Sequence, residues 1–221
     1  MTVLVLLAFI VITLKPQWLP NLSTLGRDSV SVKRADPNAN LTFKQAPANL
    51  AGLSYHEAVA KAIPSVVRIY TTNSATAGIE KGSGSGVIID KQGYIVTNQH
   101  VISGASQIQV VLDDNRDAAA KLVGVDPDND LAVLKIDLPD LTSITMGRED
   151  ELRVGDVVLA IGNPFDVGQS VSMGIVSALH RTKMGVNTFE NFIQTDAAIN
   201  EGNSGGALID SNGNLVGINN F

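Results

Sequence analysis

The sequence predicts an all-β fold, and three observations support this prediction. Short runs rich in β-branched residues follow one another from residue 65 onward. Turn signals such as Lys91-Gln92-Gly93 and Ser211-Asn212-Gly213 separate these runs at the short intervals typical of closed barrels and sandwiches. No long amphipathic helix alternates with the runs, which disfavours a doubly wound α/β sheet.

Composition narrows the class of protein further. The chain has 221 residues, of which 44% are hydrophobic and 17% are charged, and this balance excludes an intrinsically disordered protein. The net charge is −6 and no basic stripe is present, so nucleic acid is not expected as a partner. The sequence contains no Cys, which excludes disulfides, a thiol nucleophile and zinc-thiolate sites.

Residues 1–14 form an almost unbroken apolar run. The run is shorter than a typical spanning helix and close in length to a signal-peptide core, but it lacks a basic segment before it and a small-residue cleavage site after it. A buried helix is the third interpretation. Trp18 suits a membrane interface, and we favour an uncleaved membrane anchor.

Residues 15–52 are expected to be a flexible tether, because they mix polar residues with Pro and Ala and show no sustained period. A short helix is predicted over residues 54–63, where Ala58, Ala62 and Ile63 have helical spacing and Pro64 limits continuation. The strands are predicted at residues 65–70, 86–89, 94–97, 108–112, 121–125, 132–136, 157–161, 170–178, 192–195, 206–209 and 215–218.

The segment around Ser204 is the sharpest local signal for chemistry. Gly202, Asn203, Gly205 and Gly206 flank this serine, and small flanking residues let a substrate carbonyl approach its hydroxyl and the adjacent amides. On its own, the segment could equally be a glycine-rich turn between strands.

A histidine and an aspartate provide the context for Ser204. His100 follows a predicted strand, Asp130 precedes another, and the order His, Asp, Ser belongs to chymotrypsin-like folds. The nucleophile elbow of α/β-hydrolases also matches the pattern around Ser204, but there the His follows the Ser, and here no His lies beyond His180. We therefore expect His100, Asp130 and Ser204 to form a catalytic triad.

Other motifs carry weaker signals. His56 and His180 lack a second ligand at helical spacing, so both are interpreted as non-catalytic and no metal or cofactor is expected. Asp126, Asp128 and Asp130 resemble the start of a calcium loop, but the position that requires Gly is Leu131. The glycine-rich residues 82–86 precede a strand and lack the Lys of a phosphate loop.

The chain resembles the HtrA (Deg) family of serine proteases over residues 53–221. The resemblance rests on five blocks in family order: Gly84-Ser85-Gly86-Val87-Ile88-Ile89-Asp90, Thr97-Asn98-Gln99-His100-Val101, Asp130-Leu131-Ala132-Val133-Leu134-Lys135, Ile161-Gly162-Asn163-Pro164, and residues 194–206 around Ser204. The apolar start, the tether and the short segment between Tyr70 and Gly82 are most similar to a membrane-anchored, stress-sensing member.

This resemblance implies a chymotrypsin-like double β-barrel of six strands each, with the active site between the barrels. The first barrel would span residues 53–140 and the second residues 141–221. Family members carry further closing elements and a regulatory PDZ domain, so the second barrel is expected to be incomplete and the PDZ domain missing at Phe221.

The resemblance also implies roles for single residues. His100 would be the general base, Asp130 its orienting partner and Ser204 the nucleophile, with backbone amides at Gly202, Asn203 and Ser204 forming the oxyanion hole. Glu201 and Arg181 match positions of the family's activation loops. Ala198, Ile199 and Phe221 are candidates for an apolar substrate pocket, and Asp196 is expected to point away from it.

By the same resemblance, the protein would be a periplasmic homotrimer tethered to the bacterial inner membrane by one pass. Its expected substrate is a membrane-spanning anti-sigma factor, cleaved in the envelope stress response when C-termini of misfolded outer-membrane proteins bind the PDZ domain. The alternative is a membrane-tethered binding module that keeps the protease fold without its chemistry. The presence of His100, Asp130 and Ser204 argues against this alternative.

Overall fold

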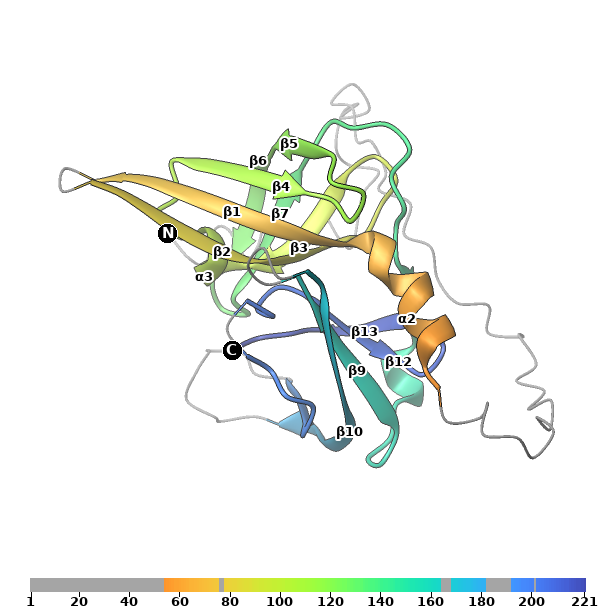
Figure 1. Ribbon diagram of the computed structural model, residues 1–221. Coiled ribbons are helices and arrows are strands. Elements are labelled where there is room, and N and C mark those ends of the chain that lie inside the picture. Colours follow the sequence, from red (N-terminus) through yellow and green to blue (C-terminus); the bar gives the residue numbers. More distant parts are fainter. Residues whose placement is uncertain (1–53, 76–77, 164–167, 182–191, 201) are drawn as a thin grey trace, which may run out of the picture. The chain divides into compact units, whose positions relative to one another are not determined.

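The structure, a computed structural model, describes residues 54–75, 78–163, 168–181, 192–200 and 202–221. Within this part the fold is mostly β, as the sequence predicts (Figure 1). The expected anchor at 1–14 and tether at 15–52 lie outside the described residues. In the described part, no helix is long and apolar enough to cross a membrane.

The first sheet has seven strands in the order β5, β4, β1, β2, β3, β7, β6. In chain order these are β1 (Val66–Ala75), β2 (Gly78–Ile88), β3 (Tyr94–Asn98), β4 (Gln107–Val111), β5 (Asp117–Ala119), β6 (Lys121–Asp126) and β7 (Leu131–Lys135). A short helix, α3 (Gln99–Ile102), follows β3 directly. The sequence analysis predicted neither α3 nor β5.

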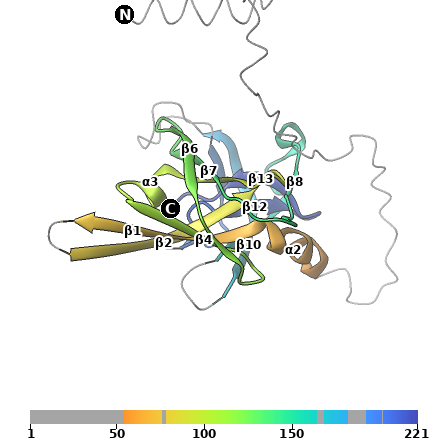
Figure 2. The same cartoon turned by 90° about the horizontal axis from the view of Figure 1, so that it is seen from above.

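The hairpin of β1 and β2 differs from the prediction. The two strands pair antiparallel from Val66 opposite Val87 out to Ala75 opposite Gly78, and they run side by side in both views (Figures 1 and 2). The segment between Tyr70 and Gly82, expected as a short connection, is therefore mostly strand. The glycine-rich residues 82–86 lie inside β2 rather than before it.

The second sheet has six strands in the order β11, β10, β9, β12, β13, β8. Its members are β8 (Thr145–Met146), β9 (Val157–Gly162), β10 (Ser170–Arg181), β11 (Phe192–Thr195), β12 (Ala207–Asp210) and β13 (Asn214–Ile218), with a 3-10 turn, η4 (Glu149–Glu151), before β9. The family resemblance implies two six-stranded barrels, the second of them incomplete. The described residues form a seven-stranded sheet and a six-stranded sheet.

Three clusters of buried apolar side chains hold the sheets together. One lies within the first sheet and includes Ile69, Ile95 and Leu134. Another lies within the second sheet around Val158 and Ala160. The third is shared: it joins residues of β1 and β2 to residues of β9, β12 and β13. Strand β9 serves two clusters because its alternate side chains point to opposite faces.

The predicted helix at 54–63 is found as α2 (His56–Ala62), which continues into a 3-10 turn, η3 (Ile63–Ser65), at Pro64. Ala58 and Ala62 are buried in the shared cluster. The Lys61 ammonium donates to the Asn212 carbonyl at 2.9 Å and to Asn214 Oδ1 at 2.8 Å. The helix therefore packs on the second sheet, although it precedes the first sheet in the chain.

Candidate active site

His100 lies in the first turn of α3, immediately after β3. The first amides of a helix have no partner within the helix, and here Asp130 supplies it. The Gln99 amide donates to the Asp130 carbonyl at 3.0 Å, and the His100 amide donates to Asp130 Oδ1 at 2.9 Å. Asn98 Nδ2 also donates to the Asp130 carbonyl, at 3.1 Å. These bonds position His100 through a residue 30 positions away.

The second carboxylate oxygen of Asp130 reaches the histidine ring. His100 Nδ1 lies 2.6 Å from Asp130 Oδ2, and the side chains are 43% and 17% exposed respectively. An ionised carboxylate only accepts hydrogen bonds, so this contact places the ring proton on Nδ1. Nε2 of neutral His100 then carries a free lone pair that can accept a proton.

The turn before Asp130 is built by Asp126. Its carboxylate accepts hydrogen bonds from the Asp128 and Asn129 amides at 3.1 and 3.3 Å and from Asn129 Nδ2 at 2.7 Å. The Asn129 side-chain hydrogen bond is the main cause that lowers the pKa of Asp126 below its usual range. Asp130 follows with a φ of +52°. The carboxylates of Asp126 and Asp130 thus have other partners. Among the described residues, no three His, Asp or Glu side chains are grouped to hold a metal.

Ser204 lies in the tight loop that leads into β12. Gly202 and Gly205 have φ values of +92° and +80°, in the left-handed region that favours glycine. Ser204 is 6% exposed. Gly84 lies between α3 and the backbone of Ser204. A Cβ on Gly84 would lie 2.7 Å from Val101 Cγ1 and 3.3 Å from the Ser204 carbonyl. The absence of a side chain at Gly84 thus brings the His100 helix and the Ser204 loop close together.

The structure joins two of the three expected triad residues by hydrogen bonds. Within the described part of the chain, no hydrogen bond is formed between Ser204 Oγ and the His100 ring. Such catalytic hydrogen bonds are often long in free enzymes and tighten when substrate binds. The observed geometry therefore gives an oriented histidine beside a serine loop.

The three amides expected to form an oxyanion hole differ in their use. The Asn203 amide donates to the Asn200 carbonyl at 2.9 Å, which closes a turn and removes it as a donor to substrate. The amides of Gly202 and Ser204 donate no hydrogen bond to any other described residue. Glu201, the expected activation residue before them, lies outside the described residues.

Ser85 of β2 was not singled out by the sequence analysis, yet it contacts the Ser204 loop twice. Its amide donates to the Ser204 carbonyl at 2.9 Å, and its hydroxyl donates to the Gly202 carbonyl at 2.7 Å. Ser85 is fully buried. The only sequence signal for this role is the place of Ser85 between glycines.

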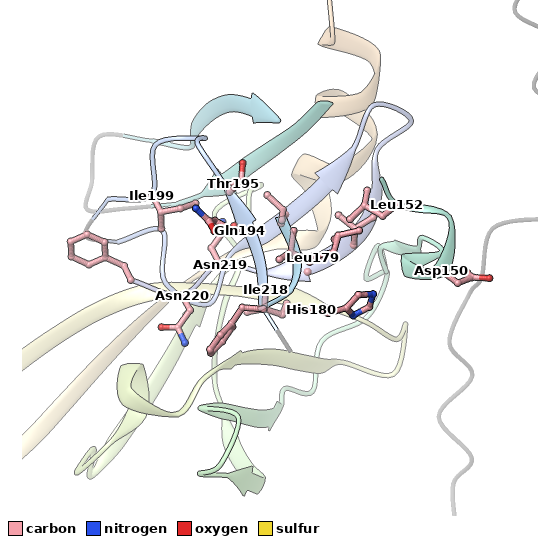
Figure 3. A pocket seen from close by; sticks show the side chains of 16 residues that line it. Asp150, Leu152, Leu179, His180, Gln194, Thr195, Ile199, Ile218, Asn219 and Asn220 are labelled. Carbon is pink, nitrogen blue, oxygen red and sulfur yellow. The ribbon is translucent and has the colours of Figure 1, made fainter. Parts of the chain in front are cut away.

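A cavity of about 800 Å³ opens beside β11 and β13 (Figure 3). Its lining includes Ile199 and Phe221, two of the three expected pocket residues, and further apolar side chains such as Leu152, Leu179 and Phe192. Ala198 is not part of the lining, and its carbonyl accepts a hydrogen bond from Ser172 Oγ at 2.7 Å.

Acidic groups are scarce in this lining. Among the described residues that form it, Asp150 is the one carboxylate, and it pairs with Arg148 at 3.0 Å. Asp196 is not part of this lining, and its Oδ1 accepts a hydrogen bond from the Ile175 amide at 2.7 Å. The cavity is therefore suited to apolar side chains.

The remaining candidates lie apart from His100 and Ser204. Arg181 is the last residue of β10, and its side chain is not among those the structure describes. His56 is exposed on α2. His180 lies in β10 with a φ of +53°, and it lines the cavity.

Comparisons with known proteins agree with this geometry. The trypsin-like peptidase domain family matches residues 84–218. The serine endoprotease DegS of Escherichia coli is 50% identical over 171 residues, covering 75% of this chain and 48% of DegS. The periplasmic serine endoprotease DegP of the same species is 57% identical over 138 residues, covering 62% of this chain and 29% of DegP.

Solved structures give the same result. The HtrA-type protease AlgW with a tripeptide is 58% identical with a TM-score of 0.71, covering 75% of this chain and 53% of that one. AlgW with a decapeptide is 51% identical with a TM-score of 0.70, covering 75% of this chain and 58% of that one. This chain thus spans about half the length of DegS and about a third of DegP.

Proposed function

Because this chain belongs to the HtrA (Deg) family of trypsin-like serine endopeptidases, we propose that it cleaves polypeptides with His100, Asp130 and Ser204 as its catalytic triad. The observation that carries this proposal is the pair of hydrogen bonds from the amide and ring of His100 to the Asp130 carboxylate. They fix both the orientation and the tautomer of the imidazole, which are the two properties that a general base requires.

Catalysis would proceed by acyl transfer. Neutral His100 takes the proton of Ser204 through Nε2 as the serine oxygen attacks the peptide carbonyl. The Asp130 carboxylate stabilises the imidazolium that results. His100 then delivers the proton to the leaving amine, and a water molecule repeats the sequence to release the acyl group from Ser204.

The amides of Gly202 and Ser204 would stabilise the negative charge on the carbonyl oxygen. Neither amide donates a hydrogen bond to another described residue, so both remain available as donors. Each such donor contributes about a 10²–10³-fold effect on kcat in comparable sites. Asn203 holds the turn between them rather than donating.

The test of this proposal is Ser204→Ala, which should abolish cleavage of an unfolded protein substrate and leave the fold intact. Only one oxygen is removed and no core methylene is lost. Wild-type protein should react with a fluorophosphonate probe at a single site, and Ser204→Ala should not. A wild-type chain that neither reacts nor cleaves would favour the binding-module alternative.

We expect cleavage after small or medium apolar residues such as Val or Ala. The cavity beside Ile199 and Phe221 has a mostly apolar lining, and Asp196 is not part of it. A peptide library with every residue at the cleaved position measures this preference. A dominant preference for Lys or Arg would contradict it.

The similarity to DegS supports a more specific role. We propose that residues 1–14 anchor the protein in the inner membrane, residues 15–52 tether it in the periplasm, and a homotrimer cleaves a membrane-spanning anti-sigma factor. Glu201 and Arg181 would then belong to the activation loops, and a PDZ domain would bind C-termini of misfolded outer-membrane proteins. Membrane fractionation and mass measurement in detergent test this role, and a soluble monomer would contradict it while leaving the protease proposal intact.

A further inference from the structure

We propose that Ser85 is a positioning residue that shapes the oxyanion hole from the opposite sheet, an inference that rests on the proposed protease function. Ser85 lies in β2 of the first sheet, 117 residues before Gly202. Its hydroxyl donates to the Gly202 carbonyl and its amide donates to the Ser204 carbonyl, at 2.7 and 2.9 Å. These carbonyls belong to the two residues whose amides would bind the substrate oxyanion.

The other polar atoms of Ser85 are also used. Its hydroxyl accepts a hydrogen bond from the Asn163 amide at 2.8 Å, and its carbonyl accepts one from Thr97 Oγ1 at 2.7 Å. Thr97 lies on β3, three residues before His100. Ser85 thus joins the serine loop, the histidine strand and the end of β9 through hydrogen bonds that are all buried.

Asn163 extends this connection to β1. Its Oδ1 accepts hydrogen bonds from Arg68 Nε and Nη2 at 3.2 and 2.9 Å, and Asn163 is 3% exposed. The guanidinium is planar and delivers both donors to one oxygen in a fixed direction. Arg68 therefore fixes the side chain of Asn163, and the backbone amide of Asn163 in turn fixes the hydroxyl of Ser85.

The serine loop is not rigid enough on its own to hold this geometry. Gly202 and Gly205 are glycines, which resist rotation of their peptide planes less than other residues do. A side chain on Gly205 would overlap the Ser85 carbonyl and Thr97 Oγ1, so the loop packs directly on Ser85. Without the Ser85 hydroxyl, the Gly202 carbonyl is released and the peptide planes beside the oxyanion donors can turn.

The experiment measures kcat, KM and the affinity for a peptide aldehyde in the full chain, with active sites titrated by fluorophosphonate. An aldehyde forms a tetrahedral adduct with the serine, so its affinity reports on the oxyanion hole. We expect Ser85→Ala to lower kcat about 10–100-fold, to leave KM within about twofold, and to weaken aldehyde binding by the same factor as kcat. Ser85→Cys keeps a donor at this position, a weaker one on a larger atom, and should give an intermediate loss.

Two control variants separate positioning from stability. Ser65→Ala removes another fully buried serine hydroxyl, one without a hydrogen-bond partner in the described structure. Val110→Ala creates a cavity in the core of the first sheet and lowers Tm. Both should keep the wild-type kcat per titrated site.

The outcomes are distinguishable. A Ser85→Ala enzyme with wild-type kcat and aldehyde affinity would overturn the inference, and so would an equal loss of kcat in Val110→Ala at the same Tm. If Ser85→Ala does not fold, Ser85→Cys decides on the same measurements. A wild-type chain without turnover or labelling would instead refute the proposed function itself.

Discussion

Asp130 accepts four hydrogen bonds, and its backbone lies in the left-handed region. Aspartate tolerates a positive φ better than most residues, and the φ of +52° turns both its carbonyl and its carboxylate toward α3. The backbone thereby stabilises the helix that carries His100, while the side chain orients the ring. The structural role of Asp130 and its proposed catalytic role thus coincide in one residue.

The first prediction concerns Asp130→Asn. A carboxylate accepts at both oxygens, whereas an amide accepts at one, so the substituted side chain must turn its NH₂ group toward either the His100 amide or the ring. With the NH₂ group facing the ring, the ring protonates on Nε2 and cannot accept the Ser204 proton. We expect kcat to fall about 10⁴-fold, as in well-studied triads, with KM little changed.

Asp128→Asn is the matched control for this prediction. It makes the same change of charge in the same exposed turn, and its carboxylate has no hydrogen-bond partner among the described residues. Steady-state kinetics with both variants provide the measurement. Equal kcat values in Asp130→Asn and Asp128→Asn would contradict the proposed role of Asp130.

The sequence predicts some residues of the site better than others. His100, Asp130 and Ser204 stand in short motifs whose order is recognisable in the chain. The partners of Ser85 lie 117 and 78 residues away, at Gly202 and Asn163, and no local pattern specifies such pairs. The amide of Asn203 was expected in the oxyanion hole, but it donates to the Asn200 carbonyl. The sequence does not reveal this turn.

At the scale of the element, β10 supports the segment that precedes the serine loop. Ser172 Oγ donates to the Ala198 carbonyl and the Ile175 amide donates to Asp196 Oδ1. Gly174 lies between them and has no room for a side chain: a Cβ there would lie 2.7 Å from Ala197 Cα and closer still to the Ala197 amide.

We therefore predict that Gly174→Ala destabilises the protein by about 1–3 kcal/mol, because the backbone at Ala197 must move. Chemical denaturation measures the change. Gly124→Ala on β6 is the control, since no atom lies within 4 Å of a Cβ there, and its effect should stay within about 0.5 kcal/mol. Equal stability of the two variants would show that the segment moves aside freely.

The elements themselves were largely predictable from the sequence. Alternating or continuous β-branched runs gave the position of most strands, and β11 has the predicted bounds. Helix α3 was missed because it has only four residues, and its amides depend on Asp130, far along the chain. β8 has two residues and exists only by parallel pairing with β13, so it has no local signal.

The two sheets share part of their hydrophobic core. Val66 and Val87 of the first sheet pack with Ile161 and Ile209 of the second, and all four are fully buried. A cluster that belongs to both sheets couples their stabilities.

The third prediction follows from this shared core. Ile161→Ala should cost about 2–5 kcal/mol and should weaken the hydrogen-exchange protection of β2 and β12 together. Val171, opposite Ile161 on β10, is 43% exposed, so Val171→Ala should change stability by less than about 0.5 kcal/mol. Loss of protection confined to β12 would mean that the sheets unfold independently.

The arrangement of the sheets was only partly predictable. The strand runs predicted the all-β class, the order of His100, Asp130 and Ser204 indicated a chymotrypsin-like fold, and the family resemblance implied two barrels. Barrel closure and strand number depend on pairings between distant edges, so the expected two six-stranded barrels differ from the observed seven-stranded and six-stranded sheets. Periodicity in a single sequence reports which face is buried, but not which strand lies beside it.

Some contacts of helix α2 can form only late in synthesis. Lys61 binds the Asn212 carbonyl, which lies 151 residues further along the chain. At about 5–20 residues per second, the ribosome needs roughly 8–30 s to add this stretch, and until then the contacts of Lys61 with Asn212 and Asn214 cannot form. The buried cluster that contains Ala58 and Ala62 is likewise incomplete until Leu215 is added. The first described helix is thus among the last parts of the chain to reach its final contacts.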